Sequence, residues 1–330
     1  MGENRATRRQ FLKQSAFGIG AAAIGRSAWA ADEGLPQRPF GKTGVRVSIL
    51  GLGGFHIGTI RDDAESIRFI RRAIDMGVTF LDNAWEYHNG RSEELVGRAL
   101  QDGYRAKVFL MTKHHGRDKK TAMQHLEDSL RRLRTDVIDL WQFHEVVYEK
   151  DPEMIFAKDG GGIEAAVEAK RQGKVRFIGF TGHKDPAIHL EMLKHDYPWD
   201  ASQMPVNVLD AQFKSFQKNV LPVMRERGIG AIAMKTMASG YILKTGQVKP
   251  EEALRFVWSQ PIDTIVSGMN SLEVLEANVR LARQYAPMPE AEQAALLART
   301  KEVAAEGKFE PFKTTRNFDG AIGRRLHGVS

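Results

Sequence analysis

Short apolar segments alternate along this chain with longer amphipathic segments. The apolar segments have the length and composition of buried strands, and eight of them occur, at 48–53, 78–82, 107–112, 137–143, 175–180, 201–206, 229–234 and 262–267. The amphipathic stretches between them have helical length, as at 64–76, 119–133, 162–171 and 251–259. Eight strand-helix units in a chain of 330 residues favour a (β/α)8 TIM barrel over an open α/β sheet.

The segment before the first strand predicts a hairpin. Residues 37–47 contain the turn sequence Gly41-Lys42-Thr43-Gly44 between two extended stretches. Beyond the strand-helix rhythm the sequence has neither an internal repeat nor an interdomain linker. We therefore expect one barrel domain, spanning 31–330.

The first thirty residues have the pattern of an export signal. The run TRRQFLK at 7–13 contains the twin arginines Arg8 and Arg9, a weakly apolar stretch follows at 15–25, and the small-residue cleavage site AWA ends at Ala30. The apolar stretch is too short for a stable membrane anchor. We expect export to the periplasm by the twin-arginine machinery, which carries folded proteins, and cleavage before Ala31.

Charge and composition agree with an enzyme rather than a nucleic-acid binder. The net charge of +7 falls to +3 without residues 1–30, because that segment carries five basic residues and one acidic residue. In the remaining chain no basic run is interleaved with aromatic residues, so we expect no nucleic-acid partner. The chain has no cysteine, which excludes disulfides, thiolate catalysis and cysteine-ligated metals.

Four polar residues follow three successive predicted strands. Asp82 and Tyr87 follow one strand, Lys113 the next, and His144 the third. The carboxyl ends of the strands in a parallel barrel converge at one mouth, where catalytic groups gather. A free phenol has a pKa of about 10, and a nearby ammonium lowers it. We therefore expect Tyr87 to be a proton donor tuned by its neighbours.

The run from Phe80 to Leu100, FLDNAWEYHNGRSEELVGRAL, resembles the signature of the aldo-keto reductase family. The similarity extends from about Arg38 to Tyr285. It implies that Tyr87 is the general acid for a carbonyl group and that Lys113 and Asp82 tune it. It also implies that His144 orients the substrate oxygen and that the hairpin closes the barrel floor.

The same resemblance implies a nicotinamide cofactor, and NADP(H) is the form that the family usually binds. The residues expected to contact it lie at the ends of strands one, five, six, seven and eight: Gly53, Thr181, Gln203, Met234, Lys235, Thr236, Met237, Ser239, Gly240, Gly268, Asn270 and Asn278. Loop seven would cover the pyrophosphate, with its backbone N–H groups as donors, and Asn278 would touch adenine.

Departures from the family pattern leave the choice of nucleotide open. Thr181-Gly182 replaces the usual Ser-Asn pair that holds the carboxamide, and Met234 stands where an aromatic ring usually stacks on nicotinamide. The segment 267–279 contains no Lys or Arg to pair with a 2′-phosphate. NAD(H) therefore remains an alternative.

Other site types fit the sequence poorly. The glycines at 51–54 begin like a dinucleotide fingerprint, but the third position is His56. The histidines 114, 115 and 183 lack a carboxylate at ligand spacing, so we expect no metal site. The substrate pocket is expected among the loops 114–119 and 145–162 and the tail 308–330, with walls from Phe55, His56, Trp85 and His115. The tail could fold over the mouth or remain disordered.

We expect a monomeric reductase of aldehydes or ketones, or a dehydrogenase of alcohols or sugars. Two alternatives stay open: a lyase or isomerase that uses tightly bound nucleotide, and a non-catalytic nucleotide-binding barrel with a regulatory role.

Overall fold

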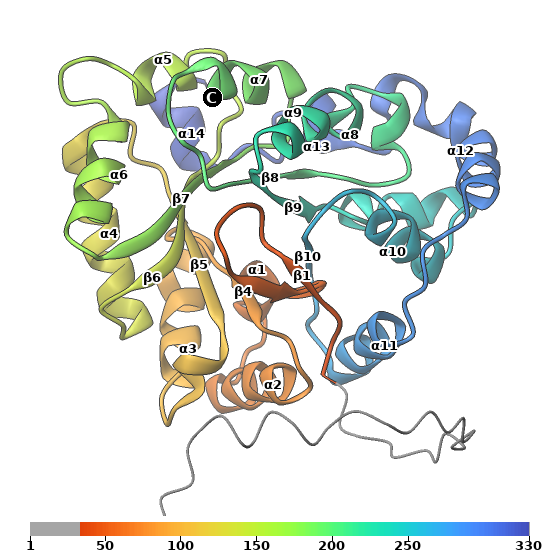
Figure 1. Ribbon diagram of the computed structural model, residues 1–330, viewed down its shortest axis with the longest axis horizontal. Helices are drawn as coiled ribbons and strands as arrows, with labels where there is room; N and C mark the ends of the chain where they lie inside the picture. The colour runs from red at the N-terminus through yellow and green to blue at the C-terminus, as the bar shows by residue number, and fades with distance from the viewer. Residues whose placement is uncertain (1–33, 330) are drawn as a thin grey trace, which may run out of the picture. The chain divides into compact units, whose positions relative to one another are not determined.

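Eight parallel strands close into a barrel, with helices around its outside (Figure 1). The computed structural model describes residues 34–329, so the predicted export signal and its cleavage site lie outside the described residues. The barrel strands follow chain order and close through pairing of the last with the first: β3 (Leu50–Gly53), β4 (Phe80–Asp82), β5 (Phe109–His114), β6 (Ile138–Phe143), β7 (Val175–Thr181), β8 (Ala201–Pro205), β9 (Gly230–Met234) and β10 (Thr264–Ser267). Each overlaps a predicted strand, which confirms the (β/α)8 fold.

Four of the helices, α2, α4, α6 and α10 in the list that follows, coincide with the predicted amphipathic stretches. They are α1 (Gly54–Ile57), α2 (Asp63–Asp75), α3 (Arg91–Ala99), α4 (Lys119–Leu133), α5 (Asp151–Ile155), α6 (Gly162–Arg171), α7 (Pro186–Lys194), α8 (Phe216–Asn219), α9 (Leu221–Glu226), α10 (Pro250–Trp258), α11 (Leu272–Arg283), α12 (Glu290–Ala304), α13 (Pro311–Thr314) and α14 (Ala321–Leu326). In the residues that the structure describes, none of these helices has the length and apolarity needed to cross a membrane.

Local chemistry explains where a typical helix begins and which face it buries. The side chain of Asp62 caps α2 by accepting a hydrogen bond from the Glu65 amide at 2.6 Å. The buried positions Phe69, Ile70 and Ala73 are spaced as one helical stripe, and that stripe joins the large core between the helices and the barrel.

The predicted hairpin closes the amino-terminal end of the barrel. β1 (Gln37–Pro39) pairs antiparallel with β2 (Arg46–Ser48). Between them Phe40 is fully buried, with its ring centroid 5.9 Å from that of Phe80 and 5.2 Å from that of Phe109, the first residues of β4 and β5. The ring also fills the space beside Gly230, where a Cβ would come within 2.8 Å of it. The hairpin is therefore the floor of the barrel interior.

The carboxyl-terminal tail packs on the loops at the other end of the barrel. Phe312 in α13 is fully buried, and Asp319 pairs with Lys184 at 2.5 Å and accepts a hydrogen bond from the Tyr148 hydroxyl at 3.0 Å. The backbone amide of Gly320 donates to the carboxylate of Glu145. Of the two expectations for the tail, the structure therefore supports folding over the mouth.

Candidate active site

The four predicted catalytic residues meet at the carboxyl-terminal mouth of the barrel. Asp82 ends β4, Lys113 is the penultimate residue of β5, and His144 follows β6 directly. Tyr87 reaches the same place from the loop after β4. The Nζ of Lys113 lies 2.5 Å from Oδ1 of Asp82 and 3.2 Å from the Tyr87 hydroxyl.

The side chain of Lys113 is buried and is held in place by the groups around its ammonium. Only 1% of its side chain is exposed, and its ammonium also donates to the backbone carbonyl of Asn83 at 2.7 Å. A buried ammonium needs such partners, since an unpaired charge in the interior is costly. The same ammonium lies 4.7 Å from the centroid of the Tyr87 ring, so the lysine holds the phenol in position.

A tight left-handed turn positions Tyr87. His88 and Asn89 directly after it have φ values of 52° and 56°, and Gly90 has φ 91°. These three residues reverse the chain from the strand end into α3. The hydroxyl of Ser92 then donates to the carbonyl of Gly54 at 2.7 Å, which ties the start of α3 to the first strand loop.

The electrostatic effect on Tyr87 differs from the prediction. Burial raises the pKa of Tyr87 well above its ordinary value, and the carboxylates of Asp82, Glu86 and Glu145 raise it further. The expected lowering by Lys113 is wrong for this structure, because that ammonium is already paired with Asp82. Tyr87 therefore remains a protonated phenol at neutral pH and can donate its proton.

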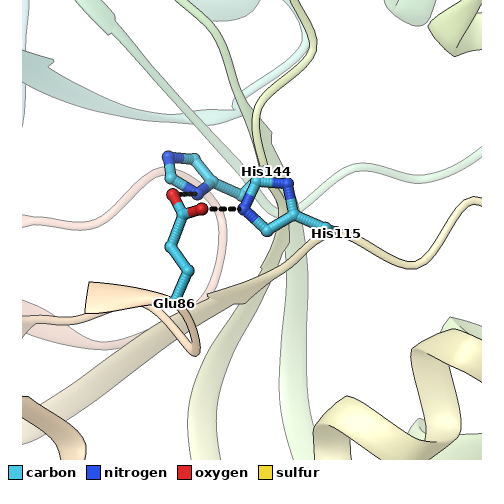
Figure 2. Close-up of side chains that lie close together, drawn as sticks. All are labelled: Glu86, His115 and His144. Atoms are coloured by element: carbon cyan, nitrogen blue, oxygen red, sulfur yellow. Dashed lines mark ion pairs between the residues drawn. The ribbon is translucent and has the colours of Figure 1, made fainter. Parts of the chain in front are cut away.

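Glu86 is a residue that the sequence analysis missed. One of its carboxylate oxygens lies 2.7 Å from Nε2 of His115 and the other 3.2 Å from Nδ1 of His144 (Figure 2). Burial opposes ionisation of Glu86, but the two imidazoles outweigh it and lower the pKa of the carboxyl group. Burial lowers the pKa of His144, with Glu86 acting in the opposite direction. The signal in the sequence was an acidic residue directly before the candidate acid Tyr87.

Glu145 is a second missed carboxylate, directly after His144. It lies 2.8 Å from Nε2 of His183 and accepts from Gly320 of the tail. Burial opposes its ionisation, but His183 and His144 together with the tail amide bring its pKa down to about 2. Glu145 thus joins the barrel mouth to the tail as an ionised acceptor.

Two predicted carboxamide ligands lie side by side. Thr181 at the end of β7 is in register with Gln203 in β8, and both are buried. Gly182 follows Thr181, and a Cβ there would clash with the backbone carbonyl of Val146. The approach of that carbonyl explains why this chain has glycine at 182, where the resembling family has Asn.

Loop seven adopts a compact turn with its own hydrogen bonds. Met234 ends β9, Lys235 follows with φ 53°, and Thr236 is buried. The amide of Ala238 donates to the carbonyl of Lys235 at 2.7 Å, and that of Gly240 to Met237 at 2.8 Å. These two amides are engaged within the loop, so they are not among the backbone N–H groups of the loop that could donate to a pyrophosphate. The side chain of Ser239, in the same loop, is exposed to solvent.

Lys235 faces the tail. Its ammonium lies 5.4 Å from the ring centroid of Phe312 and 5.3 Å from that of Phe318. Burial lowers the pKa of Lys235, with Glu145 opposing this effect. The lysine is therefore a cation at the boundary between loop seven and the tail.

Loop eight presents an uncharged surface. Gly268 and Asn270 are exposed, whereas the side chain of Met269 between them is fully buried. The amide of Asn278 in α11 donates to the Ser267 hydroxyl at 3.1 Å, at the end of β10. Gly53 in β3 packs against the backbone of Ser267, where a Cβ would lie 3.0 Å from its carbonyl oxygen. The first and eighth strand loops thus approach each other closely.

The expected pocket walls are only partly arranged as predicted. Phe55 is 51% exposed, and its ring centroid lies 5.4 Å from that of Tyr87, so it stands at the rim of the mouth. His56 packs against Gly268. Trp85 instead stacks on His125 of α4, with a centroid distance of 3.8 Å, and belongs to the helix packing.

Comparison with known proteins agrees with this geometry. The model of the Aldo/keto reductase family matches residues 49–285. The chain is 30% identical to the aldo-keto reductase YhdN of Bacillus subtilis over 225 residues, which is 63% of each chain. It is 26% identical to the uncharacterized oxidoreductase YqkF of the same organism, over 81% of this chain and 97% of that one.

Solved structures show the same fold. The holo form of aldo-keto reductase AKR11C1 from Bacillus halodurans superposes with a TM-score of 0.69 at 23% identity, over 84% of this chain and 99% of that one. An aldo/keto reductase from Klebsiella pneumoniae in complex with NADP and acetate has a TM-score of 0.65 at 21% identity, over 79% of this chain and 94% of that one. The barrel, its mouth and these matches show that the chain belongs to the aldo/keto reductase family.

Proposed function

We propose that this protein reduces the carbonyl group of an aldehyde or ketone with a nicotinamide cofactor, and that Tyr87 is the general acid. One observation carries the proposal: the chain Asp82–Lys113–Tyr87, with contacts of 2.5 Å and 3.2 Å, lies at the carboxyl-terminal mouth of the barrel. A buried ion pair in that place orients a phenol toward the space where substrates of such barrels react.

The residues present fit a nicotinamide nucleotide. Thr181 at the end of β7 and Gln203 within β8 are buried neighbours, and the hydroxyl and the amide have the donor and acceptor groups that a carboxamide requires. A bound reduced nicotinamide supplies the hydride. Tyr87 donates the proton to the carbonyl oxygen, Lys113 holds the phenol in place, and His144 orients that oxygen.

NADP(H) is the proposed cofactor, since the relative from Klebsiella pneumoniae was solved with NADP. The uncharged surface of Gly268 and Asn270 keeps NAD(H) as the alternative.

The direct test is to purify the protein, denature it, and identify any released nucleotide by mass spectrometry. The nucleotide-loaded protein is then supplied with a panel of aldehydes and ketones while absorbance of the reduced nicotinamide is followed. We expect a nicotinamide nucleotide and turnover of at least one carbonyl compound. Failure to bind either NADPH or NADH in titration would overturn the proposal.

We also propose that the protein works in the periplasm after export by the twin-arginine route. The pattern at 7–30 supports this, with Arg8 and Arg9 before an apolar stretch and a small-residue cleavage site. Replacing both arginines by lysine is expected to retain the uncleaved chain in the cytoplasm, whereas the periplasmic wild type should begin at Ala31. Equal periplasmic yield of the two forms would contradict the route.

A further inference from the structure

Lys235, the first residue after β9, is a half-buried cation that has no anionic partner. Its ammonium forms neither an ion pair nor a side-chain hydrogen bond within residues 34–329, whereas the buried Lys113 pairs with Asp82. The ammonium lies instead over two rings of the tail, 5.4 Å from the centroid of Phe312 and 5.3 Å from that of Phe318. Aromatic faces attract a cation but do not neutralise its charge. Lys235 therefore retains the capacity to bind an anion.

The carboxylates at the mouth are already engaged with other groups. Because each of them has its own donors, none needs Lys235 as a counter-charge. The partners are Lys113 for Asp82, His115 and His144 for Glu86, His183 and the Gly320 amide for Glu145, and Lys184 and the Tyr148 hydroxyl for Asp319.

Lys235 lies over the mouth, where loop seven meets the tail. Burial lowers the pKa of Lys235, with Glu145 opposing this effect and Lys113 adding to it. Burial also lowers the pKa of His56 in the first strand loop, and Lys235 lowers it further. Charges act on one another over short distances in salt solution, so the ammonium lies close to groups from the first, third and fourth barrel strands and their loops. The ammonium is thus within reach of a molecule bound at the mouth.

The backbone of Lys235 is held in a conformation that is unfavourable for lysine. Its φ is 53°, in the left-handed region where a Cβ meets steric hindrance. The carbonyl of Lys235 accepts hydrogen bonds from the Asn207 side chain at 3.3 Å and from the Ala238 amide at 2.7 Å, which hold the residue there. Backbone strain of this kind is concentrated at functional sites, so the conformation favours a role for the side chain.

We propose that Lys235 binds an anionic group of the substrate, and that the substrate is therefore an oxo acid whose carbonyl group is presented to Tyr87. This inference rests on the proposed function. An ammonium is a point charge that pairs with a carboxylate, and partial burial strengthens the attraction. The rings of Phe312 and Phe318 beside the ammonium offer an apolar surface for the carbon atoms between the two polar groups of such a substrate.

Probe aldehydes that differ in charge test this substrate class. The probes are para-formylbenzoate and ω-oxobutanoate, and the methyl ester of each is its neutral match. With reduced nicotinamide nucleotide, we expect the wild type to prefer the acid of at least one pair by about tenfold or more in kcat/KM. Lys235→Met should abolish that preference, and Lys235→Arg, which keeps the charge, should retain it. Lys244→Met removes an exposed lysine from the same loop and is the matched control.

Binding can also be measured without turnover. Protein loaded with the oxidised nucleotide has no hydride to transfer, so calorimetric titration with each acid and its ester gives their affinities directly. We expect the wild type to bind the preferred acid about tenfold or more tightly than its ester, and Lys235→Met to bind the two equally. Circular dichroism checks that the variants are folded, and titration of NADPH and NADH into each variant measures any effect on the cofactor.

The outcomes separate the substrate from the cofactor as the source of the anion. A wild type without preference for either acid, or a preference that survives in Lys235→Met, would overturn the proposal. Nucleotide affinity that falls tenfold in Lys235→Met while the acid-to-ester ratio stays unchanged would assign the lysine to the cofactor pyrophosphate and would also overturn it. Acid binding that depends on Lys235, in a protein that reduces no carbonyl compound, would contradict the proposed function and leave the anion site supported.

Discussion

The Nζ of Lys113 lies 2.5 Å from Oδ1 of Asp82, and neither side chain is more than 4% exposed. Removing one partner of such a pair leaves an uncompensated buried charge. We predict that Lys113→Met lowers the free energy of unfolding by about 3–5 kcal/mol. The double variant Asp82→Asn/Lys113→Met should recover part of that loss. Chemical denaturation of the single and double variants measures this, and a Lys113→Met protein as stable as the wild type would contradict it.

A second prediction concerns the cofactor phosphate. Asn270 is exposed in loop eight, and Arg324, an alternative source of charge, donates to the carbonyls of Arg316 and Asp319 in the tail. We predict that Asn270→Arg tightens NADPH binding by about tenfold or more and leaves NADH nearly unchanged, because it adds a charged partner for the 2′-phosphate. Asn270→Gln is the uncharged control. The measurement is titration of NADPH and NADH into the wild type and both variants. A wild type that already binds NADPH a hundredfold more tightly than NADH would show that another residue supplies the charge.

A third prediction uses the clash at Gly182. Restoring the family residue with Gly182→Asn should not improve nicotinamide binding, because the new Cβ would run into the carbonyl of Val146. We expect a loss of stability of about 1–3 kcal/mol, typical of overpacking. Thr181→Ser, which shortens the neighbouring side chain, should be tolerated better. Thermal melts and nucleotide titration of both variants check this, and a stable Gly182→Asn protein with tighter binding would refute it.

A fourth prediction concerns pH and the tail. Lys313 of α13 lies 2.7 Å from Asp210 and 3.0 Å from Glu310, and all three side chains are fully buried. Burial raises the pKa of Glu310 from 4.5 to about 7, with Lys313 opposing the shift. Between these values the folded protein holds a proton that the unfolded chain has released. The contribution of Glu310 to stability therefore decreases as pH rises from 4.5 to about 7.

The measurement is the difference in unfolding free energy between wild type and Glu310→Gln across that range. We expect this difference to change with pH by at most about 3 kcal/mol, in the direction that disfavours the wild type at the alkaline end. Glu306→Gln, which makes the same change at an exposed position four residues earlier, is the matched control. A Glu310→Gln difference that is equally flat would contradict the raised pKa.

The barrel could be predicted from the sequence because each strand and helix follows from local pattern. The apolar run before Lys113 and the amphipathic stretch of α4 need no distant contact to be recognised. Convergence of Asp82, Lys113 and His144 followed from the rule that parallel strands of a barrel end at one mouth. The residues of the site that lie at the ends of strands could therefore be predicted from the sequence.

The remainder depends on contacts that local pattern does not contain. Tyr148 meets Asp319 across 171 positions of sequence, so the docking of the tail could be named only as one of two alternatives. The raised pKa of Tyr87 arises from burial and from Asp82, Glu86 and Glu145, whose side chains surround it only in the folded barrel. The role of Glu86 likewise depends on His115 and His144 arriving from two other loops.

Tyr87 is the residue on which the account depends most. Tyr87→Phe keeps the ring and removes the acidic proton, so the most direct measurement is kcat for carbonyl reduction by this variant, alongside direct titration of its nucleotide. We predict a loss of about 10²–10⁴ in kcat, the scale of general acid catalysis, with nucleotide affinity retained. A Tyr87→Phe enzyme that reduces a good aldehyde substrate at the wild-type rate would contradict the assignment of the proton donor.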